Sequence, residues 1–76
     1  MMLSIRTYKT RKSDDALIYK TYRFPCFDTN IEFDGLPFEE KFNKAVEVLK
    51  EEIQEDRYNN NMKEYSPIVI CDIWMN

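Results

Sequence analysis

Histidine is absent from the 76-residue chain, and glycine occurs only once, at Gly35. Without histidine, the chain lacks the commonest general base, the commonest metal ligand and the usual switch for pH near neutrality. A single glycine cannot build either of the glycine-rich loops that hold phosphate groups, because both need at least two. We therefore expect a protein that is not an enzyme, with no metal and no cofactor.

Cysteine is also scarce, and its spacing excludes two common kinds of site. Cys26 and Cys71 lie far apart, without the paired spacing of a zinc or redox motif. We expect both thiols to be reduced, with Cys26 exposed and Cys71 packed as a small apolar side chain. No apolar run approaches the roughly 20 residues that span a bilayer, and no signal peptide is indicated. These absences favour a cytoplasmic location.

The chain has 43% hydrophobic residues and a net charge of -3. This composition indicates one small globular domain over residues 1–76. Charge is divided unevenly, with six basic and two acidic residues through Phe24, and five basic and twelve acidic residues from Pro25 onward. We therefore expect a dipolar molecule, with a basic N-terminal part and an acidic C-terminal part. Residues with AT-rich codons dominate, which by analogy favours a phage or mobile-element source.

Alternation of apolar and polar residues predicts two strands near the start of the chain. Residues 2–9 and 16–24 both alternate and are rich in β-branched and aromatic residues, with a polar loop between them. We expect an antiparallel hairpin that sets Leu3 beside Phe24 and Ile5 beside Tyr22, because the other parity would bury arginine among apolar groups. A short edge strand over residues 30–34 is a further expectation.

The clearest signal is an apolar stripe at helical spacing, which predicts a helix over residues 37–57. Pro37 suits its first position, and Asn59 to Asn61 favour a left-handed stop. The nearly continuous apolar run of residues 67–75 then predicts a buried, central strand. The fold class is α+β: a two-layer sandwich of order β-β-(β)-α-β, in which one helix covers one face of a three- or four-stranded, mainly antiparallel sheet.

The face that the helix leaves open is the main candidate site. In the preferred register the last strand turns Val69, Cys71, Ile73 and Met75 toward the helix. Asp72, between Ile70 and Trp74, is expected to pair with Arg6 or Arg23 across the sheet. The open face would then carry Ser4, Arg6, Tyr8, Leu17, Tyr19, Thr21, Arg23, Ile68, Ile70, Asp72 and Trp74.

Trp, Tyr and Arg are the residues enriched at protein-binding hot spots, so we expect a small protein-binding module that docks on a larger protein. By analogy, its size and acidic dipolar surface favour an inhibitor or regulator of a host protein. Its proposed contacts are Arg6, Tyr8, Tyr19, Arg23, Ile70 and Trp74 on the sheet and Glu47, Glu51 and Glu55 on the helix. Two alternatives stay open: a homodimer or other homo-oligomer, and a nucleic-acid-binding protein that uses the basic hairpin. The second would use Arg6, Lys9, Arg11, Lys12, Lys20 and Arg23.

Overall fold

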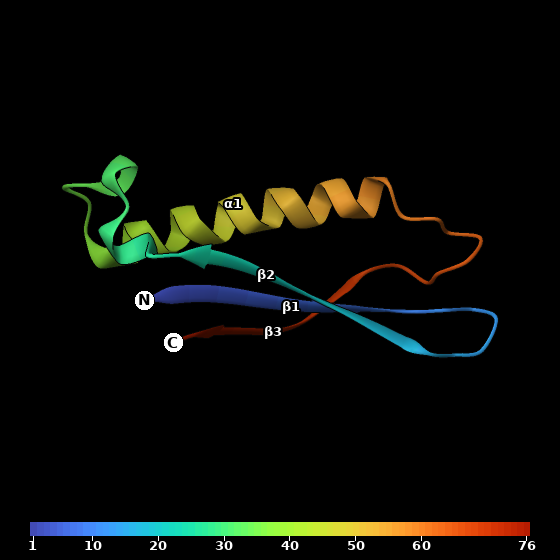
Figure 1. Cartoon of the computed structure of the whole chain (residues 1–76). Coiled ribbons are helices and arrows are strands. Elements are labelled where there is room, and N and C mark those ends of the chain that lie inside the picture. The colour runs from blue at the N-terminus through green and yellow to red at the C-terminus, as the bar shows by residue number, and fades with distance from the viewer.

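Three antiparallel strands and one long helix make up the fold, and the computed structural model describes all of residues 1–76 (Figure 1). The sheet order is β2-β1-β3. The structure confirms the predicted α+β class in its three-stranded form, with the order β-β-α-β. The elements are β1 (Met2–Thr10), β2 (Leu17–Pro25), two single 3-10 turns η1 (Phe27–Thr29) and η2 (Ile31–Phe33), α1 (Phe38–Tyr58) and β3 (Val69–Met75).

The hairpin of β1 and β2 has the predicted register, with Leu3 opposite Phe24 and Ile5 opposite Tyr22. Leu3 and Ile5 are fully buried beneath the helix. In the connecting loop, Asp14 accepts a hydrogen bond from the backbone N–H of Ala16 at 3.1 Å. An aspartate that bonds the backbone two residues ahead is a common way to form a tight turn.

The last strand differs from the prediction in two respects. It lies at an edge of the sheet, and β1 is the central strand instead. A β-bulge also interrupts its register: Asp72 pairs with Arg6, but Ile70 pairs with Thr7, so Cys71 is the extra residue. A bulge changes which side of the sheet the following residues face, because side chains alternate along a strand.

Because of the bulge, four of the predicted side-chain orientations are wrong. Ile73 and Met75 do lie on the helix side, in register with Ile5 and Leu3. Residues before the bulge are reversed: Ile68 is buried, Ile70 packs against the core, and Val69 faces the open side. The Cys71 side chain is exposed rather than packed, as Cys26 is.

The helix α1 begins and ends within one residue of the predicted bounds. Ala45, Leu49 and Ile53 are its buried residues and pack on the sheet. The predicted left-handed stop is wrong, because Asn59 at the C-cap has φ −88° and ψ 0°. Its backbone N–H bonds the carbonyl of Glu55, so the chain leaves the helix without needing a positive φ.

The segment between β2 and α1 forms turns, and the expected edge strand over residues 30–34 is absent. Asn30 accepts a hydrogen bond from the N–H of Glu32 at 2.8 Å, which starts the second turn instead of an extended strand. Phe27 and Phe33 from these turns are buried, and the ring of Phe33 stacks on that of Phe24 with centroids 5.6 Å apart. The turns thereby extend the core beyond the helix.

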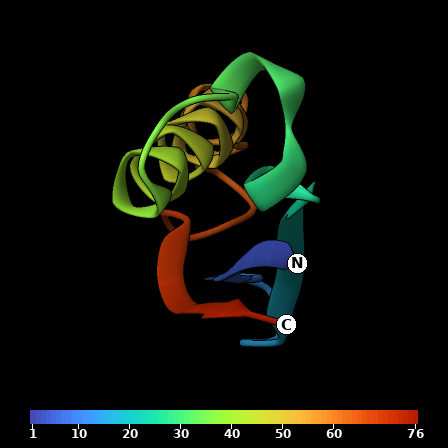
Figure 2. The same ribbon diagram turned by 90° about the vertical axis from the view of Figure 1, so that its left-hand side faces the viewer.

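All helical and turn elements lie on one side of the sheet, as the end-on view shows (Figure 2). The opposite face is covered by no other part of the chain. No helix in the structure has the length and apolar character needed to cross a membrane.

Candidate protein-binding face

Strand register brings the main predicted binding residues together on the open face of the sheet. Tyr8 lies opposite Tyr19, while Ser4 lies opposite both Arg23 and Trp74. Arg6 is two residues from both Ser4 and Tyr8 on β1, so it shares their face. We call this surface the open face and define it by five side chains: Arg6, Tyr8, Tyr19, Arg23 and Trp74.

Arg6 and Trp74 form the first contact of the open face. The guanidinium carbon of Arg6 lies 5.1 Å from the centroid of the Trp74 ring. A cation over an indole face is attracted by the ring quadrupole and contributes about 0.5–1 kcal/mol at exposed sites. The predicted ion pair of Asp72 with Arg6 or Arg23 is not formed, although Asp72 is the register neighbour of Arg6. Arg6 is held by the ring instead.

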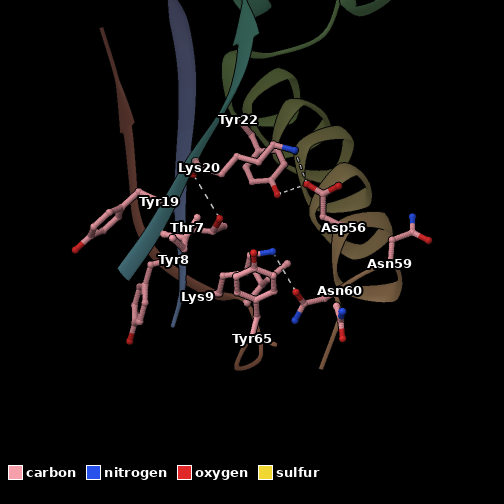
Figure 3. Close-up of a pocket in the computed structure, with 13 residues that line it drawn as sticks. Thr7, Tyr8, Lys9, Tyr19, Lys20, Tyr22, Asp56, Asn59, Asn60 and Tyr65 are labelled. Atoms are coloured by element: carbon pink, nitrogen blue, oxygen red, sulfur yellow. Dashed lines mark hydrogen bonds and ion pairs between the residues drawn. The ribbon is translucent and has the colours of Figure 1, made fainter. Parts of the chain in front are cut away.

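Tyr8 and Tyr19 form the second contact, from the central strand and its neighbour. Their ring centroids are 6.3 Å apart, with planes inclined at 48°. Tyr19 is 58% exposed, and no hydrogen bond holds its hydroxyl. Both rings point away from the end of the helix, as the close-up shows (Figure 3). The pair therefore presents aromatic area and at least one free hydroxyl to solvent.

Ser4 lies at one end of the open face, between Arg23 and Trp74 on the two neighbouring strands. Its side chain is only 1% exposed, because its neighbours across both strands are the long residues Arg23 and Trp74. The Ser4 hydroxyl has no hydrogen-bond partner. A buried hydroxyl without a partner costs about 1–3 kcal/mol.

Four predicted contacts lie elsewhere. Ile70 faces the helix side because of the bulge, so it does not join the open face. Glu47, Glu51 and Glu55 are exposed on α1, which lies across the sheet from the open face (Figure 2). No single flat partner surface can contact both the open face and these acids.

A groove on the helix side was not predicted from the sequence. It has a volume of about 460 Å³ and lies between the hairpin and the end of α1 (Figure 3). In it, Lys20 Nζ lies 2.6 Å from an Asp56 carboxylate oxygen, and the Tyr22 hydroxyl donates to the same oxygen. Lys9 Nζ donates to Asn60 Oδ1 at 3.2 Å and lies 4.0 Å from the Tyr65 ring centroid.

The contacts of Asp56 change the acidity of two groups. The hydrogen bonds from Lys20 and Tyr22 lower the pKa of Asp56, and they outweigh burial, which acts in the opposite direction. Burial, followed by the bond to Asp56, raises the pKa of Tyr22 to about 12. At neutral pH the site therefore holds an ionised carboxylate and a neutral phenol. The only sequence signal for it was the division into a basic hairpin and an acidic helix.

The residues of the nucleic-acid alternative are divided between surfaces. Lys9 and Lys20 occupy the groove, whereas Arg6 and Arg23 lie on the open face. The two remaining side chains have contacts within the chain: Arg11 pairs with Asp14 at 3.1 Å, and Lys12 donates to the carbonyl of Met62 at 2.6 Å. The six basic residues thus form no continuous stripe.

Two further observations concern metal ions and similarity to other proteins. No group of three or more His, Cys, Asp or Glu side chains is placed to hold a metal ion. Comparisons with models of protein families, with curated proteins and with solved structures gave no match to the chain.

Proposed function

We propose that the chain is a small protein-binding module that docks on a larger protein through the open face. The observation that carries this proposal is the group of Arg6, Tyr8, Tyr19, Arg23 and Trp74 on a sheet face that no other part of the chain covers. These residue types dominate binding energy at protein interfaces, where they supply rigid area and directional hydrogen bonds.

The side chains of the open face also contact one another within the chain, without a partner. Arg6 is already stacked on Trp74, and Tyr8 already contacts Tyr19. Side chains that are fixed in advance lose less conformational entropy on binding, which costs about 0.5–1.5 kcal/mol for each flexible side chain that becomes immobilised.

The helix acids contribute in a different way. Because Glu47, Glu51 and Glu55 lie on the far side of the sheet, they act through their field and not by contact on the same surface. The molecule is a dipole, and a dipole orients itself in the field of a charged partner before contact. We propose an inhibitor or regulator of a larger host protein, oriented with its arginine-bearing face toward the partner.

The experiment compares a tyrosine on the open face with a tyrosine that lies away from it. The tagged chain is used to capture partners from an extract of its native host, as wild type and as Tyr19→Ala and Tyr58→Ala. Tyr58 is the matched control, because it is 89% exposed and lies at the end of α1, away from the open face. We expect Tyr19→Ala to lose the partner and Tyr58→Ala to keep it. Equal recovery by the two folded variants would contradict the open face as the binding surface.

Binding to nucleic acid is the rival proposal, and a salt titration separates the two. Phosphate contacts release counterions, so affinity for single-stranded DNA or RNA must fall steeply as salt rises. The division of the six basic residues between two surfaces argues against such binding, as does the net charge of -3. Retention of single-stranded nucleic acid that weakens with salt, and weakens further in Arg6→Ala, would favour the rival.

A further inference from the structure

The two edges of the sheet differ in how well they could accept another strand. An exposed edge strand is a template for pairing, and bulges or short edges oppose it. The β3 edge is interrupted by the bulge at Cys71. The β2 edge is nine residues long, and its register with β1 is unbroken from Leu17 to Pro25. The β2 edge is therefore the better template.

Hydrogen-bond alternation shows which groups of β2 point outward. The N–H of Arg11 donates to the carbonyl of Ala16 at 2.8 Å, so this opposed pair is hydrogen-bonded. In an antiparallel pair such positions recur at every second residue. The even-numbered residues of β2 therefore bond β1, and the odd-numbered residues direct their N–H and C=O groups outward. No other hydrogen bond in the chain uses the outward groups of Leu17, Tyr19, Thr21 and Arg23.

We propose that a second copy of the chain pairs with this edge, antiparallel β2 to β2, about a two-fold axis at Thr21. Outward groups must meet outward groups, which limits the possible registers. An axis at Thr21 pairs all nine residues and places Arg23 opposite Tyr19 of the second copy. It also places Leu17 opposite Pro25. Proline has no N–H to donate, and this is tolerated at the end of a ladder.

Two neighbouring registers, centred on Lys20 and on Arg23, are worse because of charge, and a register centred on Tyr22 pairs only seven residues of β2. An axis at Lys20 would set that residue opposite its own copy, and an axis at Arg23 would do the same there. Like charges directly opposite are destabilising in a sheet. With the axis at Thr21, no charged residue of β2 faces another. Two threonines then meet at the centre, which is a favourable cross-strand pair.

The helix flank supplies charge complementarity for this pairing. A shallow groove of about 360 Å³ runs beside β2 and is lined in part by Glu52 and Glu55. Neither carboxylate takes part in an ion pair within the chain. In the proposed register, Lys20 of the second copy comes opposite Tyr22, which faces this flank. The basic strand of each copy thus approaches the acids of the other.

Pairing through β2 would join two sheets into one of six strands. The open faces of the two copies would then be continuous across the axis, with Arg23 of each beside Tyr19 of the other. This arrangement does not depend on the proposed partner, since it uses the strand edge and not the open face. Its failure and the failure of the proposed function are therefore separate results.

Sedimentation velocity at micromolar concentrations tests whether the dimer exists. We expect a dimer for the wild type and for Thr21→Val, which keeps the backbone N–H and the β-branched shape. Thr21→Asp places two carboxylates opposite each other on the axis, and we expect the dissociation constant to rise about tenfold or more. A strictly monomeric wild type, or equal association by all three folded proteins, would overturn the proposal.

Disulfide formation tests the register and does not depend on the behaviour of Thr21→Asp. In a Cys26→Ser, Cys71→Ser background, Thr21→Cys places two thiols on a hydrogen-bonded pair, where Cα atoms lie about 5.5 Å apart and a disulfide can form. Arg23→Cys is the matched control, since its two thiols would be four positions apart, roughly 13 Å. Fast crosslinking of Thr21→Cys alone supports the axis. Equal or faster crosslinking of Arg23→Cys overturns it.

Discussion

Removal of the Tyr22 hydroxyl isolates the contact that joins the hairpin to the end of the helix. Tyr22→Phe deletes one oxygen atom and leaves a buried ring in place. The lost group donates to Asp56, whose carboxylate also contacts Lys20 Nζ at 2.6 Å. The substitution therefore tests whether the hydroxyl stabilises the packing of α1 on β2.

The expected magnitude follows from the exposure of the acceptor. A hydrogen bond to a charged group contributes about 1.5–3 kcal/mol when well shielded. The Asp56 side chain is 35% exposed and keeps its contact with Lys20, so water replaces part of the loss. We expect the unfolding free energy to fall by about 1 kcal/mol, which lowers the melting temperature of a domain of this size by about 4–8 °C.

The same contact predicts a dependence on alkaline pH. Burial and the bond to Asp56 raise the pKa of Tyr22 from 10.0 to about 12 in the folded state. A group whose pKa is raised on folding stabilises the protein fully below its unfolded pKa, and this stability disappears as pH rises through the folded value. The difference in unfolding free energy between the wild type and Tyr22→Phe should disappear between about pH 10 and pH 12.

Thermal unfolding followed by circular dichroism measures both effects, at pH 7 and again across the alkaline range. Tyr19→Phe is the control, because its hydroxyl is exposed and has no hydrogen-bond partner. We expect Tyr19→Phe to melt with the wild type and Tyr22→Phe to melt below it at neutral pH. If Tyr22→Phe and Tyr19→Phe melt together at pH 7, the contact with Asp56 does not stabilise the fold.

Three further predictions concern acid, the core and the bulge. The pKa of Asp56 is lowered on folding, so the stabilisation by its carboxylate is present above about pH 4 and is lost as pH falls through the folded pKa. Urea unfolding should therefore show a smaller change in unfolding free energy between pH 7 and pH 3 for Asp56→Asn than for the wild type. Leu49→Ala empties a fully buried site and should cost about 2–5 kcal/mol in the same urea assay, whereas a loss well below this range would mean that the core is not packed as described. Both thiols should react with a coloured thiol reagent in the folded protein, and slow reaction of Cys71 relative to Cys26 would contradict the bulge.

The hairpin and the helix could be predicted because their sequence patterns have strong physical causes. In the hairpin, only one parity keeps Arg6 and Arg23 away from Leu3 and Phe24, so the cost of burying charge selects the register. In the helix, apolar residues recur at one spacing from Phe38 to Ile53, which is about four turns, and no competing pattern overlaps them. Both were confirmed, the helix to within one residue.

The last strand could not be predicted in full because its sequence does not show which alternate side chains face the helix. From Pro67 to Cys71 nearly every side chain is apolar, so neither face is marked as the buried one. A bulge at Cys71 can then reverse the strand without burying a charge. The run of apolar residues also suggested a central strand, although only Ile68 in this region is buried and Ile73 and Met75 remain exposed.

The candidate site was predicted in part for the same reason. The open-face residues of the hairpin followed from its register, and Trp74 lies after the bulge, where the assumed alternation still holds. Ile70 lies before the bulge and was misplaced. The groove around Asp56 and Lys9 depends on how the loop after α1 folds back toward the hairpin, and no local pattern in that loop indicated this.

Hydroxyl-radical footprinting of the captured complex tests the central claim most directly, because it reports which aromatic side chains the partner covers. Trp74 and Tyr19 lie on the open face, and Tyr58 at the end of α1 serves as an internal reference in the same molecule. We predict that Trp74 and Tyr19 become protected on binding while Tyr58 stays reactive. Protection of Tyr58 with no change at Trp74 and Tyr19 would contradict this claim.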